Sequence, residues 1–423
     1  MAGGRGRGSV GRALCVLALL TAGLVACGGD EGGTPSLSWY TFPEPSGAFD
    51  AAATDCTEAA EGRYRIEVKD LPTTADGQRE QLVRRLAAED SDVDLMFMDV
   101  IWTAEFAEAG WLLPFDEEVA ADITEGVLEG PLATATYQDR LWGAPITSNT
   151  QLLWYRKDRV DDPPETWDQL IEAAEALPEG ERLVQAQGSR YEGLTVWFNA
   201  LLASSGGTVI EGEGDDPEVT IGDEATVRAL EVLRDFSTSP AADPALSNSD
   251  ENIGRLEFQT GSSSFMVNYP FIFPSAREEA PEVFDNLGWA RYPGIEEGEP
   301  SAPPLGGGNI GIGAFTDHPE EAVDAVRCLI SADNQVRYAT DGGLPPTIDE
   351  VYDDEALREN YPFADLLRDS INEAGPRPVT PAYNDISRVI YTTIHPTSSI
   401  DPEGDVESLE EKVGQAVRSE GLL

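Results

Sequence analysis

Short apolar runs alternate with helix-like segments in the first quarter of the chain. Residues 37–41 (LSWYT), 64–68 (YRIEV) and 93–98 (VDLMFM) have the length and apolar content of strands. Residues 47–60 and 77–90, which lie between these runs, have helical composition or spacing. The order β-α-β-α-β with short connections predicts an α/β fold with mostly parallel sheets flanked by helices.

In such a sheet, ligands bind beyond the carboxyl ends of the strands. The segments that follow the three predicted strands are residues 42–46, 71–76 and 99–102. We therefore expect ligand-binding side chains in or directly beside these segments.

A polar break interrupts the next extended segment. Residues 142–158 predict two strands, separated by the polar residues 147–150, and such a break is typical of a crossing between two lobes. Residues 262–273 predict an apolar strand that runs into an aromatic loop. Further helices are predicted at residues 162–177, 193–207, 225–237 and 318–331, and the last part of the chain is rich in helix.

The N-terminus has the pattern of a secretory signal. A basic head without acids precedes an apolar run at residues 13–25, which is shorter than the roughly 20 residues of a membrane-spanning helix. Residues 24–27 (LVAC) resemble the bacterial lipobox, in which the cysteine becomes the lipidated N-terminus. On this interpretation Cys27 is the anchor and residues 27–36 are a flexible tether. An ordinary signal peptide with an incidental cysteine is the alternative.

The chain is strongly acidic. It has 28 basic and 78 acidic residues, a formal net charge of −50, and the acids are spread along the sequence. Nucleic acid is excluded as a partner because its binding needs clustered basic residues. No CxxC, HExxH or calcium-loop pattern occurs, so we expect neither a metal nor another cofactor. In an exported protein the remaining cysteines, Cys56 and Cys328, predict a disulfide, with two buried free thiols as the alternative.

Several motifs occur in an order that resembles a known family. They include DLMFMDVIWTAEFAEAGWLLPFDE, an APIT-N-T-LLWYR crossing, ETWDQL, a G-x-x-x-FMVN strand and a helix of the HPEEAVDAV type. In this order the motifs resemble family 1 extracellular solute-binding proteins, the sugar receptors of bacterial ABC importers. Within that family VIWTAEFAEAGWLLP, TSNTQLLWYR and RPVTPAYNDIS are most similar to the actinobacterial trehalose-binding lipoproteins.

The resemblance implies a two-lobe periplasmic-binding-protein fold of type II, with a ligand cleft that closes by a hinge motion. It implies a monomeric receptor without catalytic activity that binds a disaccharide, with trehalose favoured, and delivers it to ABC importer permease subunits. Cys56 and Cys328 would then lie on the same lobe. The implied organisation is a signal peptide at residues 1–26, a tether at 27–36, an N-lobe at 37–147 plus 312–345, and a C-lobe at 148–311 plus 346–423.

A neutral disaccharide presents hydroxyls and apolar C–H faces, so its site needs carboxylates, amides and aromatic rings. The positions just after the predicted strands select Glu44, Asp76, Gln78 and Asp99 as ligand-binding candidates. A solvated loop acid is the alternative for each carboxylate.

The second half of the chain supplies the other candidates. Asn268 and Tyr269 follow a predicted strand, and Gly307 lies in a glycine run that allows backbone to approach a ligand closely. The resemblance adds Asn149 in the crossing, Glu257 and Arg377. Relatives usually carry tryptophan in the loop after Asn268, where this chain has tyrosine and phenylalanine.

Two other function classes stay open at this point. A secreted glycoside hydrolase needs a carboxylate pair at a set separation, and the many acids of this chain do not allow the sequence to exclude such a pair, although no hydrolase motif occurs. A receptor for another ligand, such as a maltose-type oligosaccharide, a glycerophosphodiester or a polyamine, would have the same fold.

Overall fold

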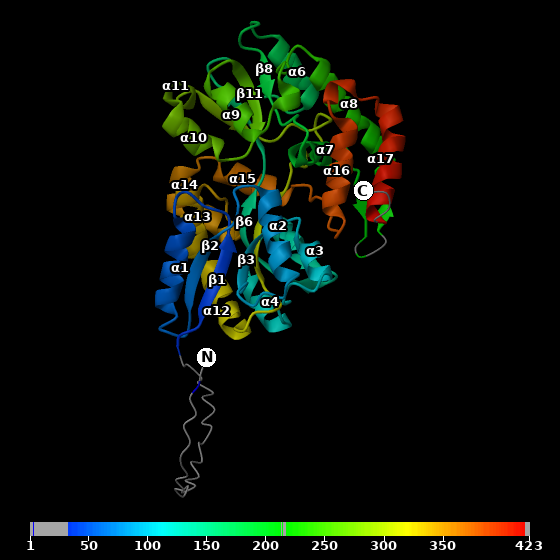
Figure 1. Cartoon of the computed structure of the whole chain (residues 1–423). Helices are drawn as coiled ribbons and strands as arrows, with labels where there is room; N and C mark the ends of the chain where they lie inside the picture. Colours follow the sequence, from blue (N-terminus) through cyan, green and yellow to red (C-terminus); the bar gives the residue numbers. More distant parts are fainter. Residues whose placement is uncertain (1–2, 4–32, 213, 215–216, 419–423) are drawn as a thin grey trace, which may run out of the picture. The chain divides into compact units, whose positions relative to one another are not determined.

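The first of two mixed sheets contains five strands in the order β2-β1-β3-β13-β6 (Figure 1). The computed structural model describes residues 3, 33–212, 214 and 217–418. In this sheet β1 (Ser36–Thr41) pairs in parallel with β2 (Arg65–Asp70) and β3 (Leu95–Asp99). β13 (Gly306–Ile312) runs antiparallel between β3 and β6 (Gly143–Asn149). We call this the N-lobe sheet.

Helices and a disulfide fix one side of the N-lobe sheet. α1 (Ala48–Ala59) packs on β2 and on α12 (Pro319–Leu329) and α13 (Ala332–Gly342). Cys56 of α1 is bonded to Cys328 of α12, with 5.8 Å between their Cα atoms. The predicted disulfide is therefore confirmed.

The second sheet, the C-lobe sheet, has the order β12-β7-β11-β8. Its strands are β7 (Leu152–Arg156), β8 (Leu183–Gln185), β11 (Ser263–Asn268) and β12 (Leu287–Ala290). Only β11 and β8 pair in parallel, whereas β7 runs antiparallel to both of its neighbours. The expectation of mostly parallel sheets is therefore wrong for this lobe, because β7 leaves the crossing in the direction opposite to β11 and β12.

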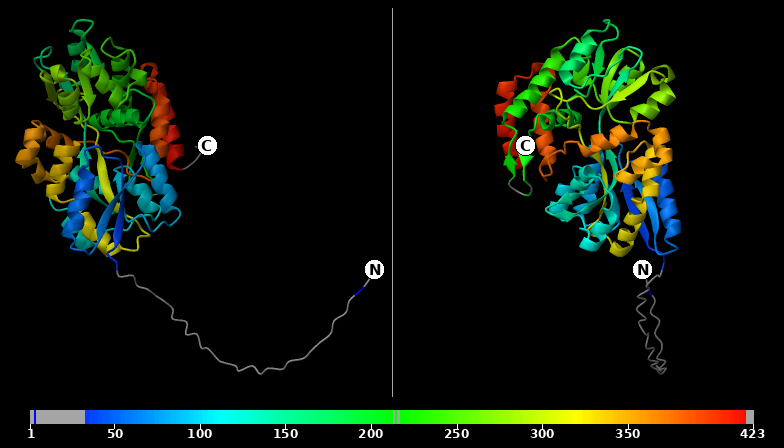
Figure 2. Two further views of the ribbon diagram at one scale, coloured as in Figure 1. Left: turned by 60° about the vertical axis from the view of Figure 1, so that its left-hand side comes forward. Right: turned by 180° about the vertical axis from the view of Figure 1, so that it is seen from behind.

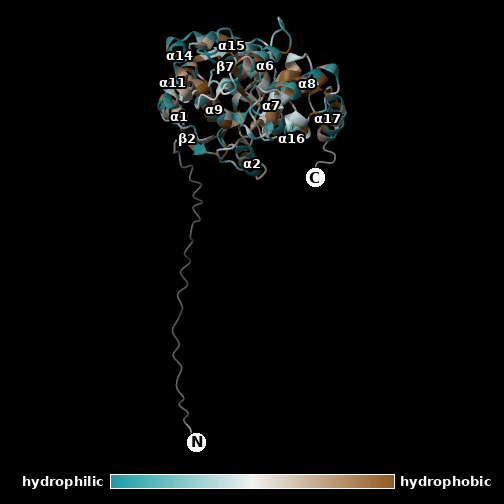
Figure 3. Ribbon diagram, turned by 90° about the horizontal axis from the view of Figure 1, so that it is seen from above, coloured by the Kyte–Doolittle hydropathy of each residue, from teal (hydrophilic) through white to brown (hydrophobic). Residues whose placement is uncertain are grey.

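Helices from the middle of the sequence and from its C-terminal part cover the C-lobe sheet. The last helices, α16 (Tyr383–Ile394) and α17 (Pro402–Val417), pack beside α7 (Glu192–Ser204) and α8 (Glu224–Thr238), as Figure 1 and Figure 2 show. With α6 (Trp167–Glu175) they enclose a large apolar core. Hydrophilic residues are spread along the helices of both lobes (Figure 3), in keeping with the solvated acidic surface that the composition predicts.

The remaining elements connect and cover the two sheets. The helices are α2 (Ala75–Leu86), α3 (Thr103–Glu108), α4 (Glu117–Ile123), α5 (Glu129–Ala135), α9 (Glu251–Gln259), α10 (Ile272–Glu279), α11 (Pro281–Phe284), α14 (Glu355–Asn360) and α15 (Ala364–Asn372). Short strands are β4 (Thr136–Tyr137), β5 (Arg140–Leu141), β9 (Ile210–Glu211) and β10 (Glu218–Val219), and single 3-10 turns span Leu246–Asn248, Asp349–Asp353 and Thr397–Ser399.

The chain passes between the two sheets more than once. It crosses from β6 to β7, returns from β12 to β13, and reaches α16 after α15. Residues 306–311, expected in the C-lobe, pair with β3 and β6 in the N-lobe sheet instead, because β13 fills the gap between those strands. The other lobe boundaries stay a prediction.

The described part of residues 35–423 forms one compact unit with its own cores. The predicted signal peptide and Cys27 lie outside the described residues, as does most of the predicted tether. Among the described residues, no helix has the length and apolar character needed to cross a membrane.

Candidate functional site

A buried arginine joins the two lobes. Arg377 lies on the segment between α15 and α16, and its side chain is only 6% exposed. One terminal nitrogen forms an ion pair with Glu192, the first residue of α7. The other lies 3.5 Å from Oδ1 of Asp99, the last residue of β3, and 3.5 Å from the carbonyl oxygen of Leu305. The guanidinium therefore contacts an acid from each lobe.

Tyr383, the first residue of α16, completes this arrangement on the C-lobe side. Its hydroxyl donates a 2.7 Å hydrogen bond to Oε1 of Glu192, and its ring centre lies 5.7 Å from the guanidinium carbon of Arg377. Burial raises the pKa of Tyr383, and the negative charge of Glu192 acts in the same direction. The tyrosine therefore stays protonated and acts as a hydrogen-bond donor.

Further polar residues lie at the end of β11 and at the start of α9. Asn268 donates from its amide to the carbonyl oxygen of Glu251 at 2.9 Å and accepts from the backbone of Tyr269 at 2.9 Å. Burial, and then the charge of Glu251, raise the pKa of Tyr269, whereas Arg377 opposes this rise. Asn268 thus links the backbone at the start of α9 to the backbone that follows β11.

Burial disfavours the ionised form of two of the acids, Asp99 and Glu251. Burial raises the pKa of Asp99, and Arg377 opposes that effect. Burial also raises the pKa of Glu251, with a contribution in the same direction from Glu192, while the neighbouring hydroxyl of Tyr191 opposes it. We call the group of Asp99, Glu192, Glu251, Tyr269, Arg377 and Tyr383 the interlobe cluster.

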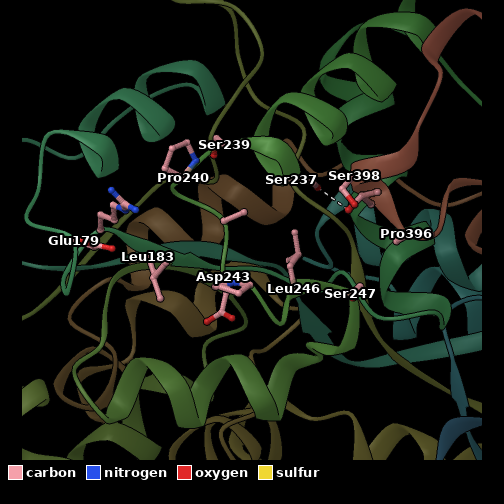
Figure 4. A pocket seen from close by; sticks show the side chains of 14 residues that line it. Glu179, Leu183, Ser237, Ser239, Pro240, Asp243, Leu246, Ser247, Pro396 and Ser398 are labelled. Atoms are coloured by element: carbon pink, nitrogen blue, oxygen red, sulfur yellow. Dashed lines mark hydrogen bonds between the residues drawn. The ribbon is translucent and has the colours of Figure 1, made fainter.

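A separate hollow lies on the C-lobe, between the end of α8 and the turn at residues 396–398 (Figure 4). Its volume is about 480 Å³. Several of its polar groups are already paired: Ser237 donates to Thr397 at 2.6 Å, and Asp243 accepts from Gln185 at 2.8 Å.

A family profile of bacterial extracellular solute-binding proteins matches residues 43–336. The chain belongs to this family. The matched segment includes Asp99, Glu192, Glu251 and Tyr269, whereas Arg377 and Tyr383 follow it.

Individual relatives agree with this assignment. The solute-binding protein is 27% identical over 377 residues to a probable ABC transporter-binding protein of Deinococcus radiodurans, with 84% of this chain and 87% of the relative covered. Maltose-bound MalE3 of T. maritima is 26% identical and superposes with a TM-score of 0.78, over 89% of this chain and 98% of that one. Thiaminase-1 of Paenibacillus thiaminolyticus is 24% identical over 384 residues, which cover 86% of this chain and 88% of the relative. These likenesses extend over most of the chain and over both lobes of the fold.

The structure brings three of the sequence-predicted residues together in the cluster: Asp99, Tyr269 and Arg377. Asn268 is fully buried, and its side chain bonds the backbone of Glu251 and of Tyr269. Asn149 ends β6 opposite Gly306, and its side-chain oxygen accepts from the backbone of Thr150 at 3.1 Å.

The backbone geometry at position 307 requires a glycine. Its φ is +120°, and a Cβ atom there would lie 2.3 Å from the carbonyl oxygen of Thr147 in β6. A glycine is therefore needed for the pairing of β13 with β6, whether or not a ligand also approaches.

Glu44, Asp76 and Gln78 lie at helix starts in the N-lobe. The carboxylate of Glu44 accepts from the backbone of Ser46 and of Ala48, both at 2.8 Å, and so caps the start of α1. Asp76 is exposed in the first turn of α2, and Gln78 is buried in the same helix. Their part in ligand binding stays a prediction.

Half of the cluster was not predicted from the sequence, and another acid on α9 was expected in its place. Glu257 is exposed near the end of α9, and the structure places Glu251, at the start of that helix, in the cluster instead. Glu192, Glu251 and Tyr383 all stand at the first position of a helix. These three residues could have been sought among the polar residues that directly precede a predicted apolar helix.

Proposed function

We propose that this solute-binding protein is an extracytoplasmic receptor that binds a disaccharide, with trehalose favoured, and delivers it to the permease of an ABC importer. The observation that carries the proposal is the interlobe cluster, in which Arg377 contacts Asp99 from the N-lobe and Glu192 from the C-lobe. A ligand held there would contact both lobes at once, as hinge closure requires.

The chemistry of the cluster suits a polyhydroxylated ligand. Carboxylates accept hydrogen bonds from neighbouring hydroxyls, and ionised partners strengthen those bonds. The Nε atom of Arg377 is buried and has no hydrogen-bond partner among the described residues, so a donor is left over for a ligand oxygen. Tyr269 offers a ring for the C–H faces of a sugar and a hydroxyl for hydrogen bonding.

The relatives support the sugar and the transporter. The T. maritima relative binds maltose, and the Deinococcus relative carries the description of an ABC transporter-binding protein. Trehalose is favoured over maltose by the resemblance of the TSNTQLLWYR and RPVTPAYNDIS segments to trehalose-binding lipoproteins. Lipid attachment at Cys27, with residues 27–36 as a tether, would keep the receptor near its permease.

A receptor for maltose or a longer maltose-type oligosaccharide is the second candidate, because MalE3 is similar over most of this chain.

An enzymatic role finds less support. Thiaminase-1 shows that an enzyme occurs among the relatives. In this chain, however, the cysteines that the structure describes are joined in a disulfide and offer no thiol nucleophile.

Isothermal titration of residues 35–423 with trehalose, maltose and maltotriose tests the proposal. We expect saturable binding of trehalose with a dissociation constant in the micromolar range, about −8 kcal/mol. Tighter binding of maltose or maltotriose would favour the second candidate. Binding of none of the three would refute the sugar assignment, and release of glucose during incubation would refute the receptor assignment.

A further inference from the structure

A second polar contact joins the two lobes, separate from that of Arg377. Glu105 lies on α3, whose apolar side chains pack in the same core as those of β3 in the N-lobe sheet. Asn384 is the second residue of α16, whose apolar side chains belong to the core of the C-lobe. The side-chain amide of Asn384 donates a hydrogen bond to Oε2 of Glu105 at 3.2 Å. The two residues are 279 positions apart in the sequence, so the contact depends on how the lobes meet (Figure 1).

The acceptor in this contact is held in place by its own lobe. Arg79 of α2 donates from Nε to Oε2 of Glu105 at 2.7 Å, and one of its terminal nitrogens bonds Oε1. Only 30% of the Arg79 side chain and 16% of the Glu105 side chain are exposed. A two-bond ion pair of this kind fixes the orientation of the carboxylate. Because α2 and α3 belong to the same lobe, this ion pair does not require the lobes to be together.

The hydrogen bond from Asn384, in contrast, requires both lobes. Asp99 and Glu105 lie on one stretch of the N-lobe, at the end of β3 and on α3. Arg377 and Asn384 lie on one stretch of the C-lobe side, before α16 and in its first turn. A movement that opens the lobes and separates Arg377 from Asp99 would therefore also separate Asn384 from Glu105.

The carboxylate of Glu105 is occupied by the chain's own donors. It accepts two hydrogen bonds from Arg79 and one from Asn384. Its position beside the first turn of α16 is also favourable for a negative charge, because the start of a helix is the positive end of its dipole. These partners explain the placement of Glu105 without a contact to a ligand.

We infer that Arg79, Glu105 and Asn384 form a latch that closes when the lobes come together and slows the release of the bound ligand without touching it. The inference rests on the proposed function and adds positioning residues to it. A contact that exists only in the closed state stabilises that state and raises the apparent affinity for the ligand. Because the ligand enters and leaves through the open state, the latch acts on the rate of dissociation.

The test measures the rates of trehalose binding and release by stopped-flow fluorescence of residues 35–423. The proteins are the wild type, Asn384→Ala, Asn384→Asp and the control Asn286→Ala. Asn286 is a matched control because its side-chain amide donates to the carbonyl oxygen of Glu282 at 3.3 Å, within the C-lobe.

We expect Asn384→Ala to release trehalose about 3- to 10-fold faster than the wild type, the effect of one hydrogen bond. Asn384→Asp should release it faster still, because it places a second carboxylate against Glu105. The association rate should not fall in either variant, and Asn286→Ala should keep both rates of the wild type. Unchanged release from Asn384→Ala and Asn384→Asp would overturn the inference. Slower association with unchanged release would also overturn it, since Asn384 would then act on ligand entry.

An exchange of donor and acceptor distinguishes the latch from a general structural effect. In the double variant Glu105→Gln/Asn384→Asp, the new amide can donate to the new carboxylate across the lobes. Its release rate should therefore return toward that of the wild type. Release at least as fast as that of Asn384→Asp alone would contradict the latch.

A failure of the proposed function is distinguishable from a failure of this inference. If neither trehalose, maltose nor maltotriose binds, the sugar assignment falls, and small-angle X-ray scattering of the same proteins measures the separation of the lobes instead. Asn384→Asp should then have a larger radius of gyration than the wild type and Asn286→Ala, because like charges push the lobes apart. An equal radius of gyration in all three proteins would overturn the inference.

Discussion

The hydroxyl of Tyr383 donates to the carboxylate of Glu192, although the two residues are 191 positions apart in the sequence. Both residues also contact Arg377, one through its ring and the other through an ion pair. The guanidinium is thus oriented from the C-lobe side, and its second terminal nitrogen faces Asp99 of the N-lobe.

This arrangement predicts coupling between Tyr383 and Glu192 in ligand binding. Tyr383→Phe and Glu192→Gln should each weaken trehalose binding by about 1–2 kcal/mol, because each leaves part of a buried hydrogen-bonded group unpaired. The double variant should lose less than the sum of the two effects, since both act through Arg377. Titration calorimetry on the four proteins measures the coupling, and strict additivity would mean that the residues act separately.

Replacement of Arg377 tests the cluster itself. Arg377→Ala should weaken trehalose binding by about 1–3 kcal/mol, since Glu192 and Asp99 lose their shared donor. Arg190→Ala is a matched control, because Arg190 is exposed on the same lobe and precedes α7. Equal affinity of the two variants, measured by calorimetry, would show that the ligand binds elsewhere.

The pKa of Glu251 predicts a pH-dependent stability. Because burial raises this pKa above its ordinary value of 4.5, the folded state binds the proton more tightly than the unfolded state does. The stabilising contribution is complete below pH 4.5 and is lost as the pH rises through the raised pKa. Relative to Glu251→Gln, the wild type should therefore lose stability between pH 4 and neutral pH. Urea unfolding of both proteins across this range measures the difference, and a constant difference contradicts the prediction.

The disulfide predicts a dependence on redox conditions. Cys56 and Cys328 are 272 residues apart, so their bond closes a long loop in the unfolded chain. Cys56→Ala/Cys328→Ala should lower the free energy of unfolding by about 2–5 kcal/mol. Urea unfolding with and without a reductant measures this loss. The wild type should become as unstable as the double variant when reduced, and a variant as stable as the oxidised wild type would show that the bond contributes little.

The predicted anchor is testable by cell fractionation. The full chain should be recovered with the membrane fraction, and Cys27→Ser should move it to the soluble fraction. Cys15→Ser is the control, because Cys15 lies within the predicted signal peptide. A Cys27→Ser protein that stays with the membrane would mean that the lipobox interpretation is wrong.

The N-lobe was largely predictable from sequence, because its strands β1, β2 and β3 are local apolar runs separated by helices with clear periodicity. The direction of β7 was not predictable, since strand pairing depends on contacts far apart in the chain. Among the site residues, Asp99 was predicted because it stands at the carboxyl end of a strand, where ligands bind in such sheets. Glu192 and Tyr383 were missed because their roles arise from the contacts of Glu192 with Arg377 and with Tyr383, across almost 200 residues of sequence.

The position of β13 has a consequence for biosynthesis. This strand lies between β3 and β6, yet the chain supplies it only after all strands of the C-lobe sheet. While the chain is emerging from the ribosome or from an export channel, β3 and β6 have no partner between them, and the first sheet stays split. The N-lobe sheet therefore closes only after most of the chain has been made, although its first strands are made first, and such a distant closure favours slow folding.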